Sequence, residues 1–456
     1  MKQIIVPPYA PVLMEATRAI GYSLEAAVAD IIDNSITAGT AKIDINFFPI
    51  GDSYVSILDN GVGMDEERII EAMRYGGSRS SSEERDSTDL GRFGLGLKTA
   101  SLSQCRRLTV VSKRKRRYIG AQWDLSLIAK TKKWSLKVLS SDDVMTYPGV
   151  EGLSVYDSGT LVIWQDLDRM MSGEVNVDTA LGVKMDAVRD HLSLVFHRYL
   201  SGETGLKKMA ITINGLPVMP ADPFLVAKST RIMDDETILV AGQKVIVRPY
   251  ILPHLSTLSA KEVSVLGGKD GLRQQQGFYV YRNKRLLVGG TWFRMMRQGE
   301  LSKLARVRVD IPNSLDHLWT LDIKKSTAVP PEAVRKNLGS IIDKIAAGSK
   351  RTWTYRGKKE TDDSRIRIWN RFVTREGGVV YSLNRDHPLI EGLHTLSVAQ
   401  RQIFEQLLLQ IERGLPLQQL FVDLNSDKQV VNETEISKEA FISSLSRLLA
   451  DCRNVL

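Results

Sequence analysis

The sequence predicts an α+β protein of several domains. Its 456 residues suffice for about two to four domains, and 43% of them are hydrophobic, as in ordinary globular proteins. Apolar residues recur at helical spacing from Ser23 to Ile36, whereas apolar and polar residues alternate from Ala41 to Phe48, as in a strand with one buried face. Helices and strands are therefore expected to follow each other from the start of the chain.

The later elements are predicted from the same two periodicities. After a strand at Tyr54 to Leu58 we expect a helix at Asp65 to Arg74, and then strands at Arg107 to Ser112, Tyr118 to Asp124, Trp134 to Leu139 and Gly159 to Trp164. A long amphipathic segment from Thr179 to Leu200 is expected to close the first domain. Short strands follow at Met209 to Ile213, Gln243 to Ile251, Phe278 to Tyr281 and Ala305 to Ile311, and a helix begins at Pro330-Pro331.

Composition favours a cytoplasmic protein that meets polyanions. The two cysteines, Cys105 and Cys452, lie far apart and form no metal or disulfide pattern, which is typical of a reducing compartment. The start of the chain has no signal-peptide pattern, and no segment reaches the roughly 18 apolar residues of a membrane span. Lys and Arg exceed Asp and Glu by 9, which is a modest lean toward nucleic acid.

The helix expected at Ser23 to Ile36 carries a candidate polar site. Ser23 is a suitable N-cap, and Asp30 and Asn34, four residues apart, share one face of the helix. A carboxylate there can polarise a water molecule, and an amide oxygen can hold a hard cation. A solvated polar face is the alternative interpretation.

A second candidate follows the strand Tyr54 to Leu58, in Asp59-Asn60-Gly61-Val62-Gly63-Met64. The Asp59 carboxylate can accept a hydrogen bond from an exocyclic amine, and the two glycines let the backbone approach a flat ligand. An ordinary strand-to-turn Asp-Asn-Gly is the alternative.

A third candidate is the glycine-rich stretch Gly91 to Lys98, which leads into a helix. Backbone amides at the start of a helix attract anions, and Lys98 adds positive charge. The stretch is not a P-loop, because Leu97 separates Gly96 from Lys98.

These three segments, together with Gly159-Thr160, resemble in order and spacing the Bergerat-fold ATPases: type II topoisomerases, ninety-kilodalton heat-shock chaperones, histidine kinases and MutL proteins. The wording from Gly91 to Gln104 is most similar to the microrchidia (MORC) ATPases and their bacterial relatives. Asp222-Pro223-Phe224-Leu225 and the segment Gly277 to Asn283 extend the resemblance over roughly residues 1 to 345.

The resemblance implies a role for each matching residue. Asp59 would receive the adenine amino group with Thr160 beside it, Gly61, Gly63 and Met64 would wall the base, and Asn34 would bind Mg²⁺. The polar segment from Gly76 to Leu90 would be a lid whose closure over ATP joins two subunits into a homodimer. The phosphates would be held by the loop residues Gly91, Gly94, Leu95, Gly96, Leu97 and Lys98.

The chain departs from the family at one position. The general base four residues before the Asn is usually Glu, whereas this chain has the shorter Asp30. A general base must come within about 2.6–3.2 Å of its proton, directly or through one water. Hydrolysis is therefore expected to be slow or to use a second water, with Asp33 and Glu25 as weaker candidates.

The resemblance also implies a domain plan: an α/β sandwich of the Bergerat type at residues 1–205 and a transducer-like domain with a βαβ connection at 206–348. A linker at 349–365 and a mostly helical C-terminal unit at 366–456 follow. Lys325 falls where transducer domains present a catalytic lysine to the γ-phosphate, with Lys324 as the weaker choice. A surface loop with two solvated lysines is the alternative.

The densest charge run, Lys113 to Arg117, lies between two expected strands. It is either a contact to DNA phosphates or the solvated tip of a hairpin. The resulting hypothesis is a Mg²⁺-dependent ATPase that closes as a dimeric clamp on DNA, beside a restriction or phage-defence nuclease. The alternative is a nucleotide-gated binding or scaffold module with little turnover, which recruits a partner nuclease or acts like a chaperone.

Overall fold

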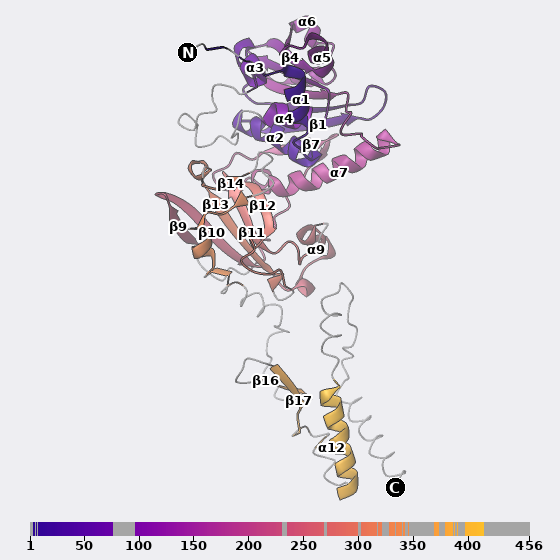
Figure 1. The fold of residues 1–456 in the computed structure, drawn as a ribbon, viewed down its shortest axis with the longest axis vertical. Helices are drawn as coiled ribbons and strands as arrows, with labels where there is room; N and C mark the ends of the chain where they lie inside the picture. Colours follow the sequence, from indigo (N-terminus) through magenta and orange to yellow (C-terminus); the bar gives the residue numbers. More distant parts are fainter. Residues whose placement is uncertain are drawn as a thin grey trace. The chain divides into compact units, whose positions relative to one another are not determined.

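The computed structural model in Figure 1 describes the chain in two compact units, residues 1–355 and 356–456. The described residues are 3–75 without 5 and 7, 96–229, 235–299 without 269 and 270, 302–321 without 317, and 328–345 without 333, 340, 343 and 344. In the second unit they are 369–373, 379–390 without 386, 388 and 389, and 397–414. The division between the units falls inside the predicted linker.

The first unit begins with an eight-stranded sheet in the order β5-β4-β3-β6-β2-β1-β7-β8. All neighbouring strands are antiparallel except β1 and β7, which are parallel. The strands are β1 (Lys42–Phe48), β2 (Tyr54–Asp59), β3 (Arg107–Arg114), β4 (Arg117–Asp124), β5 (Lys137–Leu139), β6 (Gly159–Gln165), β7 (Ala210–Ile213) and β8 (Leu216–Pro217).

Helices pack on one face of this sheet and form the main core with it. In α2 (Leu24–Thr37) the apolar residues Ala27, Val28, Ile31 and Ile32 are buried, and the Ser23 hydroxyl accepts from the Ala26 amide, as predicted. The other helices of this part are α1 (Ala10–Arg18), α3 (Glu66–Met73), α4 (Gly96–Leu102), α5 (Leu125–Thr131), α7 (Val177–Val195) and α8 (His197–Ser201).

A smaller cluster, which includes Leu58, Val111 and Leu161, lies on the opposite face. The short helix α6 (Ser141–Val144) and the 3₁₀ turn η2 (Val150–Val155) contribute Val144, Val150 and Leu153 to it. The sheet is thus covered on both faces, and the predicted α/β sandwich is confirmed.

The amphipathic segment from Thr179 to Leu200 forms two helices, α7 and α8, because the chain leaves helical geometry at Phe196. The strand at Ala210–Ile213 pairs in parallel with β1, so the first sheet continues beyond the predicted boundary at residue 205. Alternation shows that a segment is a strand, but it does not show which sheet the strand joins.

The second sheet has five strands in the order β12-β11-β13-β10-β9: β9 (Glu236–Val240), β10 (Gln243–Ile251), β11 (Gly277–Arg282), β12 (Arg285–Thr291) and β13 (Ala305–Ile311). The helix α9 (Ala260–Gly267) joins β10 to β11. Because β10 is antiparallel to β13 and β11 is parallel to it, β10 and β11 run in opposite directions and do not form the parallel pair of a βαβ unit. Short pieces complete this part: η3 (Leu255–Thr257), η5 (Asn313–Leu315), β14 (Thr320–Leu321) and β15 (Ala328–Val329). Val334, Leu338, Ile341 and Ile345 pack into the same core.

The second unit contains the antiparallel strands β16 (Trp369–Val373) and β17 (Val379–Leu383) and the helix α12 (Val398–Arg413). The Glu412 carboxylate accepts from the Leu383 amide at 2.7 Å and so ties the helix to β17. The described residues of this unit thus form strands as well as a helix, whereas a mostly helical unit was expected. Val379, Val380 and Tyr381 are residue types that favour strand over helix. None of the helices described in the chain is both long and apolar enough to cross a bilayer.

Candidate functional site

The two predicted polar residues of α2 lie in different surroundings, Asp30 buried and Asn34 exposed. Asp30 is only 4% exposed, and its Oδ2 accepts a 2.9 Å hydrogen bond from the Tyr22 hydroxyl. Gly96, at the start of α4, lies so close that an added Cβ would be 3.5 Å from the same oxygen. Asn34 is exposed, and its amide nitrogen donates to the Asp30 carbonyl at 3.0 Å. Because that bond uses the nitrogen, the amide oxygen of Asn34 is the atom directed to other ligands.

Asp59 ends β2 as a buried carboxylate held by neighbouring groups. Its Oδ1 accepts from the Gly61 amide at 2.8 Å, and its Oδ2 accepts from the Ser35 hydroxyl at 2.9 Å. Burial raises the pKa of Asp59, although these two bonds and the Thr160 amide act in the opposite direction. Thr160 lies directly opposite Asp59 in the β2–β6 pairing, as expected from its place in the sequence.

Three segments far apart in the sequence therefore meet. Ser35 joins α2 to the end of β2 through Asp59, and Gly96 places the start of α4 against Asp30. Asn34 directly precedes Ser35 on the same helix. The arrangement places three groups around α2: the buried carboxylate of Asp59, the exposed amide oxygen of Asn34 and the buried carboxylate of Asp30.

The two glycines after Asp59 are required by close packing. A Cβ on Gly61 would lie 2.9 Å from both Asp59 Oδ1 and the Ala38 Cβ. Gly63 has φ +63°, and a Cβ there would lie 2.1 Å from the Lys113 carbonyl oxygen. Both positions thus need glycine because a side chain would clash with Asp59, Ala38 or the Lys113 backbone of the protein itself. Their predicted contact with an adenine base stays a prediction.

A hydroxyl network continues beside Asp59. The Met64 amide donates to Ser112 Oγ at 2.8 Å, and Ser112 Oγ donates to the Gly159 carbonyl at 2.9 Å and lies 3.2 Å from Thr160 Oγ1. Sequence reasoning missed Ser112, Ser35 and Tyr22. Only Ser35 left a signal, because it directly follows Asn34 on a helix that was already predicted to carry polar groups.

Lys98 is buried in α4, and its ammonium donates to the Ala72 carbonyl at the end of α3, 3.0 Å away. Burial lowers the pKa of Lys98 to about 8, with Glu71 acting in the opposite direction. Leu97 packs against the main core. The other predicted phosphate contacts lie outside the described residues and stay predictions. They are Gly91, Gly94, Leu95, the lid from Gly76 to Leu90, and Lys325.

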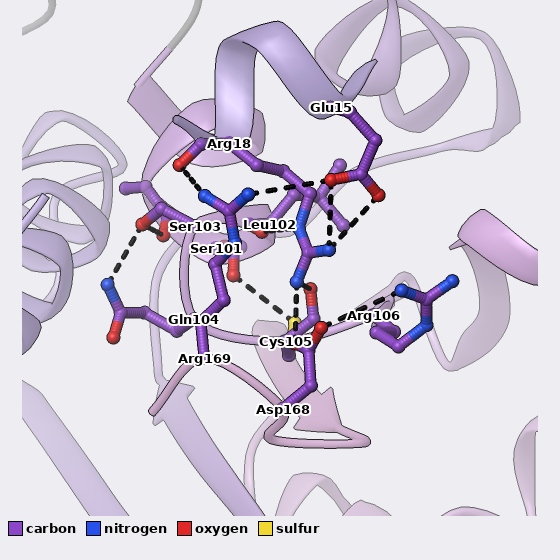
Figure 2. Close-up of polar contacts among 11 residues, drawn as sticks. Glu15, Arg18, Ser101, Leu102, Ser103, Gln104, Cys105, Arg106, Asp168 and Arg169 are labelled. Atoms are coloured by element: carbon purple, nitrogen blue, oxygen red, sulfur yellow. Dashed lines mark hydrogen bonds and ion pairs between the residues drawn. The ribbon is translucent and has the colours of Figure 1, made fainter. Parts of the chain in front are cut away.

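A polar cluster fixes the far end of α4, as Figure 2 shows. The buried Arg18 of α1 donates to the Leu102 carbonyl at 2.7 Å and to Asp168 at 2.5 Å. Cys105 is buried, with its thiol 3.2 Å from the Ser101 carbonyl. Gln104 donates to the backbone carbonyl of Tyr22 at 3.2 Å. The cluster holds α4 against α1 and against the loop that carries Tyr22, the hydrogen-bond partner of Asp30.

The basic run Lys113 to Arg117 divides into two parts. The Lys113 ammonium is internal and donates to the carbonyls of Leu153, Ser154 and Tyr156. Arg114 pairs with Asp65 at 2.8 Å. Lys115, Arg116 and Arg117 are exposed, and the first two line a cleft of about 430 Å³ together with Val62 and Ser158. These three side chains are the exposed part of the run, and Arg114 is partly buried.

Magnesium fits this site only in combination with a ligand. Within the described residues no group of three or more His, Cys, Asp and Glu side chains could hold a metal ion. Mg²⁺ usually keeps several waters and binds one or two protein oxygens plus the phosphates of a nucleotide. The exposed Asn34 amide oxygen meets that requirement.

Part of this chain is similar in sequence to known proteins. The family described as "Histidine kinase-, DNA gyrase B-, and HSP90-like ATPase" matches residues 22–160. The chain is 38% identical over 80 residues to "ATPase MORC2B" of Mus musculus, which is 17% of this chain and 8% of that protein. It is 36% identical over 66 residues to "DNA mismatch repair protein MutL" of Lactococcus lactis, 14% of this chain and 10% of that protein.

A third similarity is to the "DNA mismatch repair protein MutL" of Chlorobium phaeobacteroides, at 34% identity over 98 residues. It covers 21% of this chain and 15% of that protein. The chain therefore spans a small part of the length of these relatives. The residues that the family model matches, 22–160, include Asp30, Asn34 and Asp59.

Proposed function

We propose that this chain, whose residues 22–160 belong to the histidine kinase-, DNA gyrase B- and HSP90-like ATPases, binds ATP with Mg²⁺ and hydrolyses it slowly. The observation that carries the proposal is the meeting of α2, the end of β2 and the start of α4 around Asp30, Asn34 and Asp59. No single local pattern predicts that meeting, which a nucleotide site of this family requires.

Asp59 supplies the base recognition in this proposal. Gly61 and Ser35 hold its carboxylate in one orientation, so it can accept a hydrogen bond from the amino group of adenine. Guanine presents a carbonyl at the corresponding position, which would face the carboxylate oxygen without a hydrogen bond. A site built to pair one polar group rejects a ligand that leaves that group unpaired. We therefore expect ATP to bind in preference to GTP.

Asn34 and Asp30 supply the chemistry in this proposal. The Asn34 oxygen would hold Mg²⁺, and the bound ion would neutralise the charge that develops on the phosphates. Asp30 would accept a proton from the attacking water. The Tyr22 hydroxyl keeps the Asp30 carboxylate in place, which suits a side chain one methylene shorter than the family's usual Glu.

The same hydrogen bond favours a second candidate function. Asp30 is only 4% exposed and its Oδ2 accepts from the Tyr22 hydroxyl, so little of this carboxylate is open to an attacking water. ATP would then serve mainly as a switch that gates binding of a partner, with little turnover. In this reading Asp30 fixes the helix and performs little chemistry.

We further propose that ATP closes a homodimer near DNA. The support is the family of residues 22–160, the similarity to two DNA mismatch repair proteins, and the exposed Lys115, Arg116 and Arg117 at one hairpin tip. The predicted partnership with a restriction or phage-defence nuclease stays a prediction.

Four variants test the proposal. Phosphate release and ATP affinity by calorimetry would be measured for the wild-type chain, Asn34→Ala, Asp59→Asn, Asp30→Asn and Tyr22→Phe. We expect Asp59→Asn to lose affinity for ATP. Asn34→Ala should lose only the gain in ATP affinity that Mg²⁺ provides, and Asp30→Asn should bind ATP as wild type does but release no phosphate.

Wild-type phosphate release no faster than that of Asn34→Ala would refute the hydrolase and leave the switch. If Tyr22 keeps the attacking water away from Asp30, Tyr22→Phe will turn over faster than wild type. If Tyr22 only positions the base, Tyr22→Phe will turn over more slowly. Absence of ATP binding by the wild-type chain would refute both functions.

A further inference from the structure

A buried ion pair joins the nucleotide-site helix to the second sheet. The Arg285 guanidinium, at the start of β12, lies 3.2 Å from both carboxylate oxygens of Asp33 in α2. The two side chains are only 4% and 2% exposed. These residues are 252 positions apart in the sequence, and each belongs to a different sheet-containing part of the first unit.

The surroundings hold Arg285 in one place. Its Nη1 donates to the Leu286 carbonyl at 2.9 Å, and its guanidinium lies 5.9 Å from the centre of the Phe196 ring. The turn that precedes it is fixed by the Tyr199 hydroxyl, which donates to the Asn283 carbonyl at 2.6 Å. Arg285 is therefore a rigid contact of the second sheet and has little freedom to follow α2.

Asp33 occupies a decisive position on α2. It directly precedes Asn34 and lies three residues after Asp30, so the three side chains come from a single helical turn. Asp33 is buried against Arg285, Asp30 contacts Tyr22 and Gly96, and Asn34 is exposed. Rotation of α2 about its axis would move all three together, and the ion pair with Arg285 opposes such rotation.

We propose that the Asp33–Arg285 pair is a positioning contact that sets the orientation of Asp30 and Asn34 and connects the nucleotide site to the second sheet. The inference rests on the proposed function and deepens it. It predicts that removal of the pair impairs Mg²⁺-dependent binding and turnover, while recognition of adenine by Asp59 persists.

A double variant separates positioning from simple stabilisation. Removal of one partner would leave a buried unpaired charge, whereas Asp33→Asn with Arg285→Met removes both charges and often leaves stability nearly unchanged. The matched control is Asp316→Asn with Arg282→Met. Arg282 and Asp316 form a second buried ion pair, 2.7 Å apart, at the same hairpin but within the second sheet's own part of the chain.

The experiment measures ATP affinity with and without Mg²⁺, kcat, KM and the melting temperature for the wild-type chain and both double variants. We expect Asp33→Asn/Arg285→Met to keep its Mg²⁺-free affinity and to lose at least tenfold in kcat and in the Mg²⁺-dependent gain of affinity. Arg285→Lys, which keeps the charge without the planar fork, should lose less. The control double variant should match wild type in both nucleotide measurements.

The inference would be overturned if Asp33→Asn/Arg285→Met had the same kcat and the same Mg²⁺-dependent gain of ATP affinity as the wild-type chain. The pair would then be a structural contact only. An equal loss in the control double variant would do the same, because the effect would then follow from general loosening of the hairpin. A wild-type chain that binds ATP without turnover still tests the pair through its Mg²⁺-dependent affinity. Failure of the proposed function is recognised separately, as a wild-type chain that binds no ATP.

Discussion

Two hairpins of this protein have nearly the same local design and opposite surroundings. The β3–β4 hairpin has Lys115 and Arg116 in its turn, and the β11–β12 hairpin has Asn283 and Lys284. All four turn residues have positive φ, between 46° and 66°. Each turn is flanked by a directly opposed pair of arginines, Arg114 with Arg117 in the first and Arg282 with Arg285 in the second.

The difference lies in where the arginines point. Arg117 is exposed and Arg114 pairs with a half-exposed Asp65, whereas Arg282 and Arg285 are buried against Asp316 and Asp33. Opposed arginines repel each other, and only the second hairpin offers each of them a buried carboxylate. A run of basic residues can therefore be either a surface for polyanions or a contact between domains, depending on the surface that it meets.

The largest contrast should appear in stability. Arg285→Ala leaves the Asp33 carboxylate buried without its partner, which costs about 3–5 kcal/mol. Arg117→Ala at the equivalent place in the first hairpin should change the free energy of unfolding by less than about 0.5 kcal/mol. Urea denaturation of both variants measures the difference, and equal losses would contradict the comparison.

Acid should weaken the contact between α8 and the second hairpin. His197 Nε2 lies 2.8 Å from the Tyr281 hydroxyl of β11, and burial lowers the pKa of His197 from 6.5 to about 3. The unfolded chain therefore binds a proton that the folded chain does not, so stability is full above pH 6.5 and falls as the pH decreases. From pH 6.5 to pH 5 this histidine alone should cost about 2 kcal/mol.

Urea denaturation at several pH values tests that expectation in the wild-type chain and in His197→Gln. The variant should lose about 2 kcal/mol less than wild type over the same range. His191, whose pKa burial lowers to about 4, adds acid sensitivity to both proteins and cancels in their difference. Parallel stability curves would show that His197 is not the sensor.

The first hairpin should instead respond to polyanions. Replacement of Lys115, Arg116 and Arg117 by Gln should weaken DNA binding about tenfold and reduce the slope of log K against log salt by about 2–3. The same number of charges removed at the exposed Lys130, Lys132 and Lys133 provides the matched control. Equal effects of the two triple variants would show a diffuse charge effect and would exclude a contact at the hairpin.

The smallest effect concerns the turns themselves. Positive φ costs roughly 1–2 kcal/mol for residues with a side chain, and Asn-Gly is the preferred pair in such turns. Replacement of Lys115-Arg116 by Asn-Gly should therefore stabilise the protein by about 1 kcal/mol while it weakens DNA binding. Lys284→Gly should gain less, because Lys284 also donates to the Thr204 carbonyl. Thermal unfolding of both variants measures the contrast.

The sequence predicted several elements that carry the candidate site, because each of them is locally encoded. Helical spacing predicted α2, alternation predicted β1, and the order of the motifs predicted a resemblance to the ATPases whose family model matches residues 22–160. The same reasoning treated Lys113 to Arg117 as one basic group, whereas Lys113 is an internal donor to three carbonyls. It also offered Asp33 as a weaker general base, whereas the structure pairs Asp33 with Arg285.

The sequence alone predicted many of the helices and strands, and the resemblance of its motifs predicted that Asp30, Asn34 and Asp59 serve one site. These properties depend on neighbours within a few residues, so periodicity and motif spacing express them directly. Only the tertiary structure decided that Tyr22 and Ser35 hold the two carboxylates, that β7 joins the first sheet, and that Arg285 meets Asp33. These contacts join residues brought together by folding, and a charge or hydroxyl in a sequence does not specify its distant partner.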